Sequence, residues 1–253
     1  MFENTHLEIA NDEAERLEEM SSAVAEDTQV LEAHAGKLAR DLAWLPGVRA
    51  SDSVRERVHR LRTGIEPLLR GFRAPLPAEA PVADDVRWLH DNIRLIDMEL
   101  HDLGEALKPL RKTPHVYTPS GQVVPRAAAV AEGYLASAQF QFSESSFAAY
   151  VGSFQQVTVL NLKELFALVP ALKLCLLEEI AIRAAKVLED QHGSYSVGLV
   201  ISSLRDTTHT NWKEMLEPLI VFDGILRQDP SGTYPRMDFE SRELYRKKVA
   251  KIA

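Results

Sequence analysis

NLKELFALVPALKLCLLEEIAIRAAKVL, residues 161–188, is the stretch that decides the fold of this chain. Its apolar residues surround the helix axis instead of forming one stripe, which is typical of a helix buried among others. Asn161 and Glu164 stand in the relation of an N-cap residue and its N3 partner. Pro170 removes one backbone hydrogen bond, so we expect a kink there or two abutting helices. Cys175 is then expected to be a small buried apolar group.

Helical spacing dominates the rest of the sequence. Over residues 83–108, apolar side chains recur at steps of three and four, while His90, Arg94, Asp97 and His101 share the opposite face. We expect that face to be solvated, although the same residues would suit a metal site or an acid and base pair. Further helices are predicted at residues 26–45, 52–70, 126–139, 143–156, 195–205, 209–228 and 239 to the end. The prediction is an all-α fold, an irregular multi-helix bundle of about nine or ten helices around one buried, Pro-kinked central helix.

Two breaks organise the chain. The first is the proline-containing stretch TPHVYTPSGQVVPR, residues 113–126, which cannot continue a helix and is expected to be the main internal connection. The second, Gly71 to Pro81, is the candidate domain boundary. It divides a polar, acidic N-terminal helical segment over residues 1–80 from a main helical bundle over residues 82–253.

Charge and composition restrict the partners. The net charge is −8, and residues 1–32 hold ten acidic residues against the single basic residue Arg16, which gives that segment −9 and leaves +1 for the rest. A surface of this sign argues against nucleic acid as a partner. The acidic start is expected to be a solvated helix face or a frayed terminus. The first residues do not read as a signal peptide, and no uninterrupted apolar stretch in the sequence is long enough to span a membrane. We therefore expect a cytoplasmic chain. A single cysteine is consistent with a reducing compartment.

Motifs that would carry catalysis are missing from the sequence. There is no Gly-rich phosphate loop after a strand, no Ser nucleophile elbow, no HExxH helix and no spaced Asp-x-Asp pair that would hold a metal on a sugar diphosphate. Asp84 and Asp85 are interpreted as charges that favour the positive end of a helix dipole. We therefore assign no catalytic, cofactor-binding or metal-binding residue. A basic run near the end is expected to be solvated, with an anionic membrane or an acidic partner as the alternative; it comprises Arg242, Arg246, Lys247, Lys248 and Lys251.

Three segments together resemble one family of large bacterial enzymes. They are WLHDNIRLIDMEL (88–100), LKELFALVPALKLCLLEEI (162–180) and LRDTTHTNWKEMLEPLIVFDGILRQDPSGTYPRMDFESRELYRKKV (204–249). The last is the most specific, with an Asn-Trp helix start, an Asp-Pro-x-Gly-x-Tyr turn and Arg-Met-Asp-Phe; Pro125-Arg126 before a helix also fits. Over residues 82–253 the chain resembles the region that precedes the glycosyltransferase domain of the cyclic β-1,2-glucan synthases.

The resemblance implies a role without chemistry in this chain. Members of that family are inner-membrane enzymes that polymerise glucose from UDP-glucose and cyclise the product, using transferase and phosphorylase-like domains that this sequence lacks. The family's Gln-x-x-Arg-Trp-type motif also has no counterpart, because Arg87-Trp88 lacks the upstream Gln. The chain is therefore expected to be a non-catalytic accessory fragment on the cytoplasmic face of the inner membrane. Its own polypeptide would continue past Ala253 into the membrane and transferase regions.

The expected partner is the downstream glycosyltransferase domain, with the membrane surface reached only through segments outside this sequence. The residues expected to dock are in and after the Asp-Pro-x-Gly-x-Tyr turn: Asp229, Tyr234, Arg236, Arg242, Tyr245 and Arg246. The alternative is a freestanding helical interaction or adaptor module whose acidic N-terminal segment faces a partner. A third hypothesis is that the chain is a small enzyme that uses His and Asp residues between His90 and His101.

Overall fold

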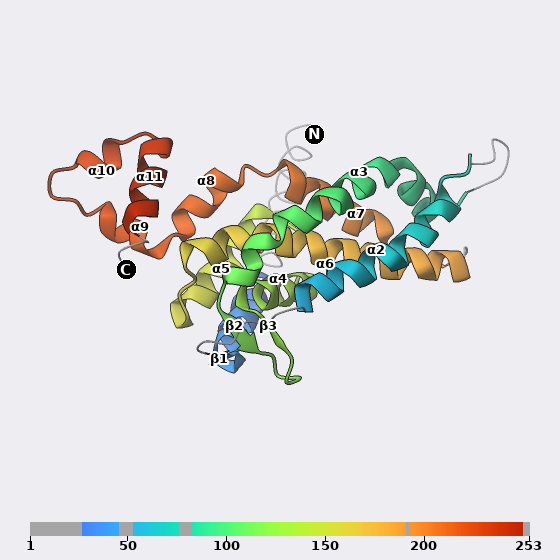
Figure 1. The fold of residues 1–253 in the computed structure, drawn as a ribbon, viewed down its shortest axis with the longest axis horizontal. Helices are drawn as coiled ribbons and strands as arrows, with labels where there is room; N and C mark the ends of the chain where they lie inside the picture. Colours follow the sequence, from blue (N-terminus) through green and yellow to red (C-terminus); the bar gives the residue numbers. More distant parts are fainter. Residues whose placement is uncertain (1–26, 46–52, 76–81, 191–192, 250–253) are drawn as a thin grey trace, which may run out of the picture.

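The computed structural model describes residues 27–45, 53–75, 82–190 and 193–249, and it confirms an all-α, multi-helix bundle (Figure 1). The first helix covers residues 27–41. The later elements are β1 (Ala43–Leu45), α2 (Ser53–Phe72), α3 (Asp84–Ala106), η1 (Lys108–Lys112), β2 (His115–Tyr117), β3 (Val123–Pro125), α4 (Arg126–Ser137), α5 (Glu144–Val157), α6 (Leu162–Glu189), α7 (Val197–His209), α8 (Trp212–Leu216), η2 (Glu217–Leu219), α9 (Val221–Leu226), α10 (Thr233–Arg236) and α11 (Phe239–Val249).

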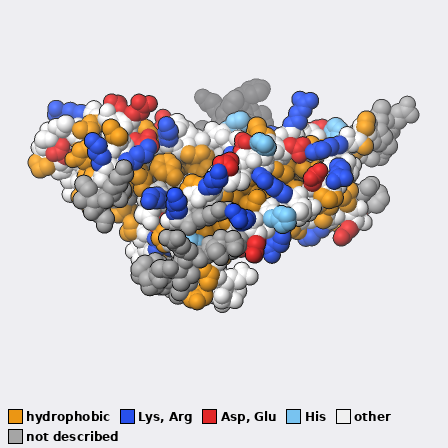
Figure 2. Space-filling model, viewed as in Figure 1, with side chains coloured by type: hydrophobic (Ala, Val, Ile, Leu, Met, Phe, Trp, Pro, Cys, Tyr) orange, Lys and Arg blue, Asp and Glu red, His pale blue; other side chains and the backbone are white. Residues whose placement is uncertain are grey.

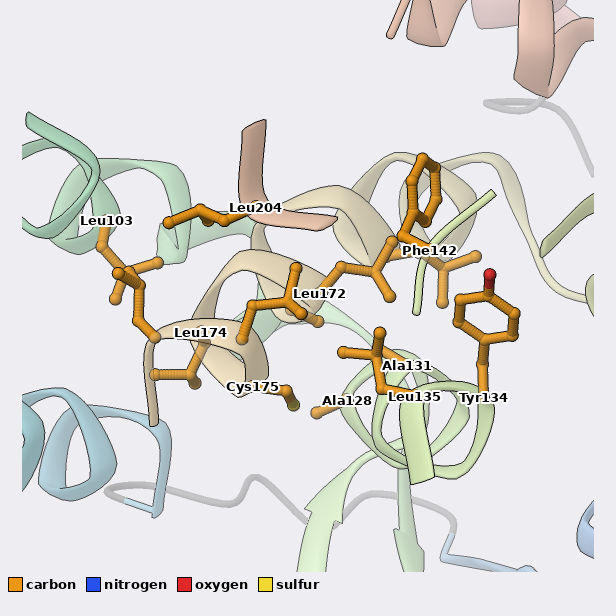
Figure 3. Close-up of a cluster of buried hydrophobic side chains, with 14 of the residues drawn as sticks. Leu103, Ala128, Ala131, Tyr134, Leu135, Phe142, Leu172, Leu174, Cys175 and Leu204 are labelled. Carbon is orange, nitrogen blue, oxygen red and sulfur yellow. The ribbon is translucent and has the colours of Figure 1, made fainter. Parts of the chain in front are cut away.

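Helix α6 is the central element, as predicted, and packs against α2, α3, α4 and α7. Figure 3 shows the Cys175 side chain of α6 pointing toward Ala128 of α4, while Leu172 and Leu174 lie on other sides of α6 in the same hydrophobic cluster, which also includes Leu103 of α3 and Leu204 of α7. Cys175 is buried, and burial raises the pKa of its thiol to about 12. A thiol with so high a pKa is rarely a thiolate near neutral pH, so the interpretation of Cys175 as a core residue is confirmed.

The start of α6 is fixed by the predicted capping box. The Asn161 side chain accepts hydrogen bonds from the backbone N–H groups of Lys163 and Glu164, at 3.0 and 3.1 Å, and the Glu164 carboxylate accepts the Asn161 N–H at 2.9 Å. Arg126, at the start of α4, donates to both Glu164 oxygens at 2.7 Å. Helix α6 stays continuous through Pro170, so the alternative of two abutting helices is wrong. Fully buried neighbours such as Leu168 hold the helix where one hydrogen bond is lost.

Strands replace two of the expected irregular or helical stretches. Residues 43–45, predicted as helix, form β1, and the connection over residues 113–126 contains the hairpin β2–β3. The three strands make one antiparallel sheet in the order β1-β2-β3, with Trp44 opposite Val116 and Val116 opposite Val124. Gly121 closes the hairpin turn with a φ of +79°, a conformation that glycine adopts without strain. Strands of three residues are too short to show an alternating pattern, which is why the sequence did not predict them.

The helix predicted over residues 209–228 is also broken. It divides into α8, the 3₁₀ turn η2 and α9, because Pro218 has no N–H to continue an α-helix and is placed near the start of η2.

The division of the chain near residue 80 stays a prediction, since residues 76–81 lie outside the described part. Side chains of α2 and of the helix over residues 27–41 nevertheless share one hydrophobic cluster with α3, α4, α6 and α7. None of the described helices is long and apolar enough to cross a membrane.

Candidate docking surface in the C-terminal helices

Residues 212–249, which we call the C-terminal unit, extend from one end of the bundle and comprise α8, η2, α9, α10 and α11 (Figure 1). Trp212 joins the unit to the bundle: its indole N–H donates to the Thr207 carbonyl at 2.8 Å, and its ring lies 5.6 Å from that of Phe142. Gln155 of α5 donates to the Leu219 carbonyl at 2.8 Å, and Leu216 is fully buried. The junction is thus apolar and hydrogen-bonded, whereas the interior of the unit is held differently.

Charged side chains form the interior of the C-terminal unit. Arg246 of α11 is only 2% exposed and donates to Glu217 at 2.8 Å and to Asp223, itself 2% exposed, at 2.9 Å. Arg242 pairs with Glu217 at 2.8 Å and Arg227 with Asp223 at 2.6 Å. We call these five residues the ion-pair cluster. It ties η2, α9 and α11 together, while the buried apolar residues Leu216 and Ile220 of the unit belong to the hydrophobic core of the bundle.

The electrostatics of the cluster favour the ionised carboxylates. Burial alone would raise the pKa of Glu217, but the hydrogen bonds from Arg242 and Arg246 outweigh it and leave that pKa below its ordinary value. Burial likewise opposes ionisation of Asp223, and hydrogen bonds from Tyr234, Arg246 and Arg227 bring its pKa down. The Tyr234 hydroxyl donates to Asp223, and burial together with that bond raises the pKa of Tyr234 to about 12.

The Asp-Pro-x-Gly-x-Tyr turn places Tyr234 in this interior. The Asp229 carboxylate accepts the Ser231 hydroxyl at 2.7 Å and the backbone N–H groups of Ser231 at 3.0 Å and of Thr233 and Tyr234 at 3.1 Å. These hydrogen bonds, that from the Ser231 hydroxyl first, lower its pKa to about 2. Gly232 has a φ of +63°, in the left-handed region that glycine enters most easily. The motif is therefore a structural turn that points Tyr234 inward at Asp223.

Apolar side chains lie on the outside of the same unit. Ile225 is 67% exposed, Leu244 59% and Tyr245 46%, and Val221 is also exposed. Figure 2 shows hydrophobic side chains at the surface of this end of the molecule. Near the turn, Ile225 and Tyr245 line an open hollow of about 540 Å³, whose wall also includes Pro230, Tyr234 and Met237. Buried charges and exposed apolar residues reverse the usual arrangement of a soluble fold, which marks the unit as a candidate docking surface.

The structure brings the six predicted docking residues into one unit but gives them different positions. Arg236 and Tyr245 are exposed and Asp229 is half-buried in its turn. Tyr234, Arg242 and Arg246 point into the interior, because Asp223 and Glu217 are there to bind them. The three inward residues stabilise the unit and do not form a basic contact face. Of the predicted basic run, Lys247 and Lys248 remain exposed, and Lys251 lies outside the described residues.

Sequence reasoning missed a second set of polar contacts, which joins α3 to α7. Asp85 accepts the N–H groups of Tyr195 at 2.6 Å and of Val197 at 2.9 Å, so it caps the start of α7 in addition to lying in the first turn of α3. Asn92 accepts from Arg205 of α7 at 2.6 Å, and Glu99 accepts from Thr208 of α7 at 2.7 Å and from Lys173 of α6 at 2.8 Å. The sequence signal that could have revealed these contacts is the seven-residue spacing of Asp85, Asn92 and Glu99, which places the three polar residues on one side of α3 beside its apolar stripe.

The other candidate clusters have simple contacts. His90 lies 3.0 Å from the carboxylate of its neighbour Asp91, and Asp97 binds Arg73 at 2.8 Å. Within the described ranges, no group of three His, Cys, Asp or Glu side chains is placed to hold a metal ion.

The chain matches no protein-family model, and a search of curated proteins finds no relative.

Proposed function

We propose that this chain is a non-catalytic helical accessory region of a cyclic β-1,2-glucan synthase-like membrane glycosyltransferase, and that its C-terminal unit docks on the transferase domain. Polymerisation of glucose from UDP-glucose belongs, in this proposal, to domains outside the sequence. The chain would act in the cytoplasm at the inner face of the inner membrane. The resemblance of residues 204–249 to that family supports the identity of the partner.

The observation that carries the docking role is the reversed burial of the C-terminal unit. Its ion-pair cluster is inside, while Ile225, Tyr245 and the open hollow between them face outward. An exposed apolar surface of this kind is typical of a protein interaction site. Fully desolvated aromatic and aliphatic anchors carry most of the free energy in such contacts, and Tyr is enriched among them. Tyr245 and Ile225 are accordingly the expected anchors.

A binding measurement tests this role. The full chain is titrated calorimetrically into a purified transferase domain of a cyclic β-1,2-glucan synthase. Ile225→Ser is compared with Leu199→Ser, a control at another exposed apolar residue, which lies on α7 outside the C-terminal unit. Loss of one anchor is worth about 2 kcal/mol, or about a 30-fold weaker Kd. Leu199→Ser should bind as the unchanged chain does. An unchanged Kd for Ile225→Ser, or no binding by the unchanged chain, contradicts the proposal.

The freestanding adaptor is distinguished by the size of the native protein. An immunoblot of cell extract, with an antibody against residues 82–253, should show a membrane-fraction band far above the 28.3 kDa of this chain if it is part of a synthase. A band near 28.3 kDa in the supernatant would favour the adaptor instead.

A further inference from the structure

The outer face of α11 carries a charge pattern that is complementary to itself. Glu240, Leu244 and Lys248 are spaced at i, i+4 and i+8 on one face of the helix, and all three are exposed. Arg246, which binds the ion-pair cluster, lies on the opposite side of the helix from Leu244. Among the described residues, neither Glu240 nor Lys248 takes part in an ion pair, so both charges are available to a partner.

Two copies of such a helix fit each other when they run antiparallel. About a two-fold axis at Leu244, a residue four positions before Leu244 meets the residue four positions after it in the other copy. The two Leu244 side chains then touch, and Glu240 meets Lys248 of the other copy at both ends. A parallel arrangement would place Glu240 against Glu240 and Lys248 against Lys248, which is unfavourable.

We propose that α11 is a self-association surface whose occupant is a second copy of this chain, packed antiparallel about Leu244. This inference goes beyond the docking role, because Leu244 does not line the hollow at Ile225 and Tyr245. The antiparallel pairing also aligns opposite helix dipoles. Stable dimers bury about 800 Å² per partner, and one helix face of residues 239–249 is a smaller contact. The association is therefore weak and reversible.

Sedimentation equilibrium of the full chain over a series of concentrations tests the association. The average mass should rise from 28.3 kDa toward twice that value as the concentration increases. Leu244→Glu should remain at the monomer mass, while Met98→Glu, at an exposed residue of α3, should associate as the unchanged chain does. Circular dichroism spectra of both variants check that they are folded. A chain that stays monomeric, or that associates equally well with Leu244→Glu, overturns the proposal.

Charge reversal tests the register and the antiparallel direction. Glu240→Lys and Lys248→Glu should each abolish association, because like charges then meet at both ends of the contact. Each change also opposes the helix dipole, so a loss by itself does not distinguish repulsion from a weaker helix. An equimolar mixture of the two variants pairs Lys with Glu at both ends and should restore the dimer mass. If the mixture remains monomeric, the antiparallel contact is refuted. A negative result here would not affect the proposed docking on the transferase domain, because that docking is tested separately with Ile225→Ser.

Discussion

Replacing Arg246 by Met tests the claim that buried charges hold the C-terminal unit together. Methionine keeps much of the length of the side chain and its packing against Phe239, whose ring centroid lies 5.3 Å from the guanidinium. It removes the hydrogen bonds to Glu217 at 2.8 Å and to Asp223 at 2.9 Å. Both carboxylates then stay buried with one arginine fewer between them.

The size of the effect follows from the partners that remain. Removing one member of a buried ion pair costs about 3–5 kcal/mol when the other charge is left alone. Here Asp223 keeps Arg227 and the Tyr234 hydroxyl, and Glu217 keeps Arg242. We therefore expect a loss of about 2–3 kcal/mol, below the range for a fully orphaned charge. Because α9 and α11 meet through this cluster, the loss should be confined to the C-terminal unit.

Hydrogen exchange measured by mass spectrometry separates this local loss from a global one. Amides of α9 and α11 should exchange about 30- to 150-fold faster in Arg246→Met, while those of α6 keep their rates. Lys247→Met is the control, because Lys247 pairs with Glu243 at the surface and such a pair contributes less than about 1 kcal/mol. Equal exchange in the two variants, or equal acceleration in α6 and α11, would refute the assignment of the cluster as the support of this unit.

Three further predictions concern other parts of the chain. The pKa values of Glu217 and Asp223 are lowered, so the two carboxylates contribute stability above their ordinary pKa values of 4.5 and 3.8, and this contribution is lost as the pH falls through the lowered values. Amides of α11 should therefore lose protection in acid before those of α6. Loss in the reverse order would contradict this. Asp85→Ala should lower the free energy of unfolding by about 1–3 kcal/mol, because two N–H groups at α7 lose their acceptor, while Asp84→Ala at the exposed neighbour has little effect in the same denaturant titration. Cys175 should react with iodoacetamide only as fast as the bundle unfolds; rapid labelling of the native chain would show that the core opens there.

The central helix could be predicted from the sequence because its signals are local and mutually consistent. The capping box at Asn161 and Glu164, and apolar residues all round the axis, require no knowledge of distant residues. The short strands were missed because three residues are too few to show an alternating pattern, and because β1 pairs with a strand, β2, that is far away in the chain. Arg242 and Arg246 were assigned to the surface for the same reason. Their partners Glu217 and Asp223 precede them by one or two helices, and only the folded chain shows that the charges meet inside.

The reversed burial of the C-terminal unit connects its stability to its proposed binding. A buried ion pair costs nearly as much in desolvation as it gains in attraction, so the cluster fixes the geometry of η2, α9 and α11, and its net contribution to stability is smaller than the cost of removing one of its members. The apolar side chains that would otherwise form a core, Ile225 and Leu244 among them, stay outside. A partner that covers them adds the missing apolar burial and stabilises the unit by an amount that grows with its concentration above Kd. Protection of the α9 and α11 amides should therefore increase when the transferase domain binds at Ile225, and it should increase with chain concentration when α11 pairs with a second copy at Leu244.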